Sequence, residues 1–105
     1  MERTQVLSSI RNVAQSFDRD KVHVRLFGSQ ARNDAKEDSD WDVLVLVDKN
    51  TLDEADHERY AYPFWMLGWQ TGAMIHPVIY TLSDWKRRKG TPFYDNVETD
   101  GILLC

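Results

Sequence analysis

Cysteine is almost absent from this chain of 105 residues, since the only one is Cys105. A lone cysteine cannot form an internal disulfide, and we therefore expect a protein of the reducing cytoplasm. The chain also shows no internal repeat, low-complexity tract or linker. We expect residues 1–105 to form a single domain, because this length supports one modest hydrophobic core.

Long apolar runs and an excess of positive charge are missing as well. Residues 1–20 carry charges at both ends and no continuous apolar stretch, which predicts neither a signal peptide nor a membrane span. Lys and Arg number 13 against 17 Asp and Glu, giving a formal net charge of −4. This balance argues against general DNA binding through a basic surface.

The apolar pattern predicts a helix followed by three strands with other elements between them. Apolar residues recur at helical spacing over 4–17 and alternate over 21–27, which indicates a helix and then a strand with one buried face. The run 41–47 is apolar on both faces and is typical of a central strand. The third strand, 73–81, contains Pro77, which indicates an edge strand or a bulge.

The region after the second strand predicts a helix that starts with a capping box. Thr51 and Glu54 fit the Thr-x-x-Glu pattern, and we expect Pro63 to kink or end the helix. Gly72 is expected to close this segment. The tail, 91–105, is expected to fold back over the core as a short helix and an extended end.

The most specific feature of the sequence joins the first two strands. Asp40 and Asp42 open the second strand, and residues i and i+2 of a strand share a face. Two carboxylates side by side need a cation between them, or one takes up a proton. Mg²⁺ prefers such oxygen ligands. The alternative is that both aspartates cap the strand and point to water.

Gly28 and Ser29, at the end of the first strand, predict an anion-binding turn. Glycine allows a backbone to approach a phosphate closely, and a helical turn that starts here offers free N–H groups. Ser29 adds a hydroxyl group, which either binds the anion or caps the turn. Arg32 supplies a positive charge that can meet a triphosphate, although a solvated loop charge is the alternative.

Phe27-Gly28-Ser29, a gap of ten residues and Asp40-Trp41-Asp42-Val43 resemble the signature of the DNA polymerase beta-like nucleotidyltransferase superfamily. The chain length and the order of elements over residues 1–81 resemble its minimal nucleotidyltransferase branch. The resemblance implies an α/β (α+β) fold. We expect a small mixed sheet of three or more strands with helices packed mainly on one face.

The resemblance also implies a reaction, in which a nucleoside monophosphate passes from an NTP, ATP being the expected one, to a hydroxyl group of a protein, RNA or small molecule. Asp40 and Asp42 would hold Mg²⁺, while Gly28 and Ser29 bind the β- and γ-phosphates. His76 stands where the family usually has a third carboxylate, and we expect it to face the two aspartates from an adjacent strand. It acts there as a general base on the acceptor hydroxyl, or it merely packs at the strand edge.

A second class of function stays open because of this histidine. The domain would then be a weakly active or inactive nucleotide-binding module. By resemblance, such a module acts as the antitoxin-like partner of a helical HEPN-type protein.

Overall fold

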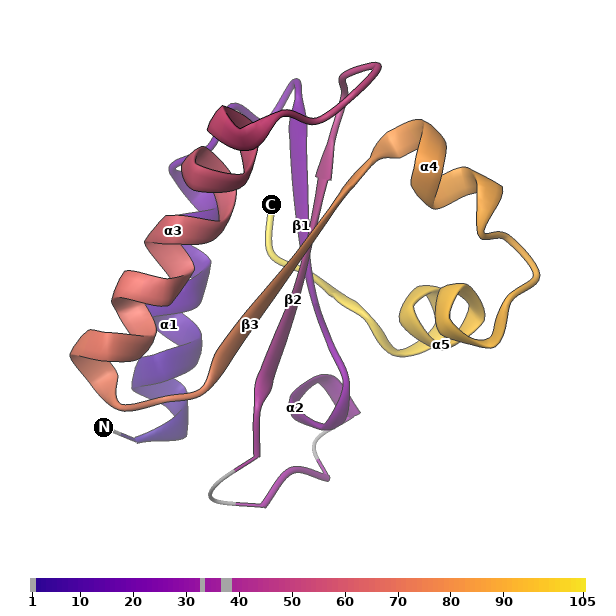
Figure 1. Cartoon of the computed structure of the whole chain (residues 1–105). Coiled ribbons are helices and arrows are strands. Elements are labelled where there is room, and N and C mark those ends of the chain that lie inside the picture. Colours follow the sequence, from indigo (N-terminus) through magenta and orange to yellow (C-terminus); the bar gives the residue numbers. More distant parts are fainter. Residues whose placement is uncertain (1, 33, 37–38) are drawn as a thin grey trace.

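The computed structural model describes residues 2–32, 34–36 and 39–105. The connection before the second strand is thus only partly described. Figure 1 shows the elements in chain order, which are α1 (Arg3–Gln15), β1 (Val22–Phe27), α2 (Ser29–Arg32), β2 (Trp41–Val47), α3 (Glu54–Thr71), β3 (Ile75–Thr81), α4 (Leu82–Arg87), α5 (Pro92–Asp100) and β4 (Ile102–Leu103).

The strands form a mixed sheet in the order β3-β2-β1-β4. Strand β1 runs antiparallel to both of its neighbours, β2 and β4, whereas β2 and β3 are parallel. The predicted central position of β2 is confirmed, and so is the edge position of β3, where Pro77 removes one backbone donor. The predicted extended end of the tail is β4, which extends the sheet beyond β1.

Both faces of the sheet are covered, which explains why β2 is apolar throughout. Val43 and Val45 point into a core shared with the two long helices, α1 and α3. Leu44 and Leu46 point to the other face and pack with Trp85 of α4 and Val97 of α5. Figure 1 shows α1 and α3 together on one side of the sheet, and α4 and α5 on the other. No helix in the described part of the chain has the length and hydropathy that crossing a membrane requires.

Helix α3 starts two residues later than the predicted capping box places it. Its N-cap is Asp53, whose side chain accepts a hydrogen bond from the backbone N–H of Asp56 at 2.9 Å. The Asp56 side chain accepts in return from the Asp53 N–H at 3.0 Å and from Lys49 Nζ at 2.7 Å. The prediction of a box at Thr51 and Glu54 was wrong. The aspartate pair prevails because Asp56 also pairs with Lys49 just beyond β2.

Pro63 neither ends α3 nor separates it into two helices, since α3 continues to Thr71. Of the two predicted effects of Pro63, ending the helix was wrong because packing outweighs the local cost, and a kink stays a prediction. A proline within a helix costs about 3 kcal/mol, whereas burying one large apolar side chain gains about 1.5–3 kcal/mol. Tyr60, Phe64 and Leu67 are all buried on either side of Pro63. The helix ends at Gly72, as predicted, in the left-handed conformation with φ of 75°.

Glu98 of α5 joins three elements and gives one prediction about stability. Its Oε1 accepts a hydrogen bond from Trp85 Nε1 at 3.0 Å and another from Arg25 of β1. Burial alone would raise the pKa of Glu98, but these hydrogen bonds and the guanidinium charge hold it below its ordinary value. Because the folded pKa is the lower one, the stabilisation is present above the unfolded pKa and is lost as pH falls through the folded pKa.

We therefore expect Glu98→Gln to lower the free energy of unfolding at pH 7 by about 1 kcal/mol. The difference from the parent should be smaller near pH 3, because protonation of the carboxyl group of the parent removes this charge as pH falls towards the lowered pKa of Glu98. Urea unfolding at the two pH values measures this. Glu54→Gln, at an exposed carboxylate of α3, is the control. An equal loss at both pH values would show that the charge of Glu98 is not the cause.

Candidate active site

Strand pairing brings the predicted site residues to one end of the sheet. Asp42 of β2 is in register with Phe27 of β1 on one side and with His76 of β3 on the other. Gly28 follows Phe27 and has φ of +75°. A Cβ atom at Gly28 would lie 2.4 Å from Oδ2 of Asp42. Glycine is required here both by the backbone conformation and by the carboxylate.

His76 contacts the other aspartate. Its Nε2 atom lies 3.3 Å from Oδ2 of Asp40, and the two side chains are about half exposed, at 49% and 53%. The prediction that His76 faces the aspartates from an adjacent strand is confirmed. The contact lies at the surface, where an incoming molecule can reach both side chains.

The charges around Asp42 act on its protonation. Burial is the main cause that raises the pKa of this carboxyl group, and the nearby carboxylate of Asp40 raises it further. The electrostatic effects of His76 and Arg32 oppose the rise, and the net result is a raised pKa. A carboxylate of this kind is stabilised by a cation that shares it.

A small cavity lies beside the aspartates, and Gly28 and Arg32 both line it. Arg32 Nε lies 3.2 Å from Oδ2 of Asp34, and Arg32 Nη1 lies 3.9 Å from Oδ2 of Asp100. Gly28 and Arg32 line a small cavity of about 130 Å³ closed by α5 residues, among them Phe93 and Asn96. Ser29, the first residue of α2, follows Gly28 directly.

The two carboxylates at this end of the sheet fit a Mg²⁺ ion that the protein and the substrate phosphates would bind jointly. Within the described ranges, no group of three or more His, Cys, Asp or Glu side chains forms a complete metal site. Magnesium is commonly bound by one or two carboxylates plus substrate phosphates and water. Asp40 and Asp42 match that requirement, whereas a structural zinc site needs four protein ligands.

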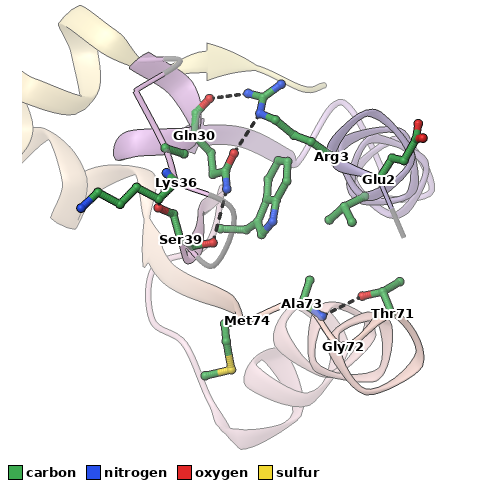
Figure 2. Close-up of a pocket in the computed structure, with 12 residues that line it drawn as sticks. Glu2, Arg3, Gln30, Lys36, Ser39, Thr71, Gly72, Ala73 and Met74 are labelled. Carbon is green, nitrogen blue, oxygen red and sulfur yellow. Dashed lines mark hydrogen bonds between the residues drawn. The ribbon is translucent and has the colours of Figure 1, made fainter.

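A larger cavity of about 430 Å³ opens on the other side of the β2 start, between α1 and the α3–β3 connection. Figure 2 shows Arg3 and Gln30 across its upper edge and Ala73 and Met74 below. Arg3 donates from Nε to Gln30 Oε1 at 3.0 Å and from Nη2 to the Gln30 carbonyl oxygen at 2.8 Å. Gln30 is 3% exposed and donates through Nε2 to the carbonyl oxygen of Ser39 at 3.3 Å.

This cavity was not predicted, and none of the predicted site residues lines it. Ser39 and Trp41, which flank Asp40 in the sequence, do line it. Arg3 and Gln30 are 27 positions apart, so no local pattern reveals their hydrogen bonds. The only available signal was a polar residue, Gln30, in a one-turn helix whose neighbours suggested a ligand site.

Comparison with known proteins places the chain in a family. A family model described as a nucleotidyltransferase domain matches residues 7–89. A protein of Methanocaldococcus jannaschii, named as a candidate protein adenylyltransferase, is 34% identical over 109 residues, which cover 97% of this chain and 98% of that protein. The chain therefore belongs to the nucleotidyltransferase domain family, as its Gly-Ser and Asp-x-Asp pattern predicts.

Solved structures confirm the fold. A chain in a toxin–antitoxin crystal structure with AMP-PNP matches with a TM-score of 0.62 and 21% identity, over 93% of this chain and 71% of its own length. A chain in the complex of a tri-AMPylated HEPN toxin of Shewanella oneidensis with an MNT antitoxin matches with a TM-score of 0.59 and 19% identity, over 99% and 72%. The predicted minimal nucleotidyltransferase fold is thus confirmed.

Proposed function

We propose that this chain transfers AMP from ATP to a hydroxyl group in a Mg²⁺-dependent reaction, with a protein as the favoured acceptor. The observation that carries the proposal is the approach of Gly28 to Asp42, beside Asp40 and His76. A bare backbone next to paired carboxylates suits a metal-bound triphosphate. The name of the archaeal relative supports a protein acceptor, while RNA or small-molecule hydroxyls are the other acceptors that this chemistry allows.

Each residue then has a definite task. Asp40 and Asp42 hold Mg²⁺, which when bound neutralises charge on the phosphates and favours an ionised acceptor oxygen. Gly28 leaves room for the β- and γ-phosphates, and the Ser29 hydroxyl group donates a hydrogen bond to them. Arg32 adds positive charge beside Asp42. His76, which contacts Asp40, would accept the proton of the acceptor hydroxyl group.

The bond changes follow from these positions. The acceptor oxygen forms a bond to the α-phosphorus while the bond from that phosphorus to the bridging oxygen of the β-phosphate breaks. Pyrophosphate leaves with the bonding electron pair, and the hydroxyl proton passes to His76 or to water. The donors around Gly28 stabilise the charge that collects on the pyrophosphate.

A second candidate function rests on His76 itself. A neutral imidazole does not provide the negative charge that a third carboxylate brings to a site with two metal ions. The chain would then bind the nucleotide with little turnover and act as an antitoxin-like partner of a HEPN-type protein. The complexes of the structural neighbours support a partner of this kind.

Incubation with each radiolabelled NTP, Mg²⁺ and host lysate tests the proposed transfer. We expect the chain to transfer the α-³²P label of ATP to protein. The label of γ-³²P ATP should instead be released in pyrophosphate. The same mixture with EDTA is the control. Label in RNA alone would contradict a protein acceptor, and no transfer from any NTP would favour the nucleotide-binding module.

His76 gives a prediction that separates the two functions. If it is a general base, His76→Ala should lower the transfer rate by about 10²–10⁴-fold and leave ATP affinity unchanged. If it marks a missing metal ligand, His76→Asp should raise the rate instead. His23→Ala, on strand β1 and separated from β3 by β2, is the matched control. Parental rates in both His76 variants would remove this residue from the chemistry.

A further inference from the structure

The outer face of α3 exposes four large apolar side chains. Tyr62, Trp65, Met66 and Trp69 are exposed to 46%, 45%, 39% and 73%. Their spacing places them on one side of the helix, opposite the residues that enter the core. We call these four residues the aromatic stripe. Single exposed apolar residues are normal, but a contiguous group with two tryptophans marks an interaction surface.

Two residues of the aromatic stripe hold each other in place. The rings of Tyr62 and Trp69 meet edge to face, with centroids 6.0 Å apart and an interplanar angle of 79°. An indole that is already held on the surface loses less conformational freedom when a partner covers it. Aromatic anchors of this kind provide much of the binding energy of protein interfaces.

The charges beside the aromatic stripe suit an antiparallel second helix of the same sequence. Arg59 is exposed and lies ten positions before Trp69. If two copies of α3 pack antiparallel about a two-fold axis level with position 64, Arg59 of one copy meets Trp69 of the other. Tyr62 meets Met66 in the same register, and the exposed Glu58 meets the neutral Gln70.

Each of these contacts between the two copies is favourable or neutral. Arginine over an indole is a cation–π contact, and a thioether beside a phenol ring is also attractive. Surfaces that pair with themselves in this way define a two-fold interface. We propose that a second copy of this chain covers the aromatic stripe and forms a two-fold dimer through α3.

The available area predicts a reversible dimer. Given about 150–250 Å² for a large aromatic side chain, the exposed fractions of the aromatic stripe amount to roughly 450 Å² per copy. Two copies and the polar rim around them bury about 1,200 Å², the lower limit of specific interfaces. An interface at this limit is typical of weak, reversible association.

This dimer leaves the candidate active site open. Helix α3 packs on the face of the sheet that Val43 and Val45 enter, whereas Asp42 alternates with them and points to the other face. Dimerisation therefore does not depend on the reaction proposed above. It can be tested without any nucleotide.

Sedimentation velocity over about 1–500 μM protein measures the dimer. We expect the parent to shift from monomer to dimer, and Trp69→Ser to raise the dissociation constant at least about tenfold. Arg59→Ala should raise it by less. The double variant should show less than the product of the two effects, because both substitutions remove the same contact. If the two effects on the dissociation constant multiply in full, the antiparallel register is wrong.

Leu103→Ser is the matched control, because Leu103 of β4 is 63% exposed and lies on the strand farthest from β3. Its dissociation constant should stay within about twofold of the parent. Circular dichroism and urea unfolding check that Trp69→Ser remains folded, which its 73% exposure predicts. A parent that is monomeric at 500 μM overturns the proposal, as does a Leu103→Ser variant that is weakened as much as Trp69→Ser.

Discussion

Replacing both Asp40 and Asp42 with asparagine is expected to abolish Mg²⁺-dependent ATP binding and AMP transfer. Asparagine keeps the shape and one oxygen of each side chain but removes the charge that holds a divalent cation. We expect ATP affinity in the presence of Mg²⁺ to fall by at least about 100-fold, and transfer to fall by about 10³-fold or more. Isothermal titration calorimetry and the label-transfer assay measure the two effects.

Stability should change in the opposite direction from activity. Burial and the charge of Asp40 both raise the pKa of Asp42, so the ionised pair destabilises the metal-free fold at neutral pH. The double variant should therefore unfold at the same urea concentration as the metal-free parent or at a higher one. Asp48→Asn, at an exposed position just after β2, should leave ATP affinity unchanged. Equal ATP affinity in the double variant and the parent would refute the metal site.

Gly28→Ala is expected to have the second largest effect. The added Cβ atom would lie 2.4 Å from Oδ2 of Asp42, which forces the carboxylate or the strand end to shift. Alanine at φ of +75° also costs about 1–2 kcal/mol of stability. We expect the free energy of unfolding to fall by at least this amount, and ATP affinity with Mg²⁺ to fall at least about tenfold because the carboxylate is displaced.

Gly72→Ala separates the two causes. Gly72 has the same φ of +75°, but a Cβ atom there would have no atom within 4 Å. This variant should lose only the roughly 1–2 kcal/mol that the backbone conformation costs, no more than Gly28→Ala loses, and keep the parental ATP affinity. Isothermal titration calorimetry with ATP and Mg²⁺ measures the affinity of both variants. If Gly28→Ala binds ATP as the parent does while remaining folded, the turn after β1 is not part of the site.

The helix, strand and turn pattern of the first half could be predicted because its signals are local. Alternation over 21–27 and the two-sided apolar run 41–47 reflect burial of one face and of both faces. The left-handed Gly72 was also a local signal, since few residues other than glycine adopt that conformation. Thr51 misled the prediction of the helix start because the Asp53–Asp56 pair forms the cap instead. Pro63 does not end the helix because core packing around Phe64 outweighs its local cost.

The candidate site likewise has a part that the sequence predicted and a part that it did not. The sequence by itself determined that Asp40 and Asp42 share a face and that a Gly-Ser turn precedes them, because two-residue periodicity is a property of any strand. The resemblance to nucleotidyltransferases predicted that His76 faces the two aspartates from an adjacent strand, but the tertiary structure decided the pairing in which β1 and β3 flank β2 and Gly28 approaches Asp42. It also decided that Arg3 bonds to Gln30 and that the aromatic stripe remains in solvent. These contacts join positions far apart in the chain, and pairing and packing of the whole sheet select them rather than any local pattern.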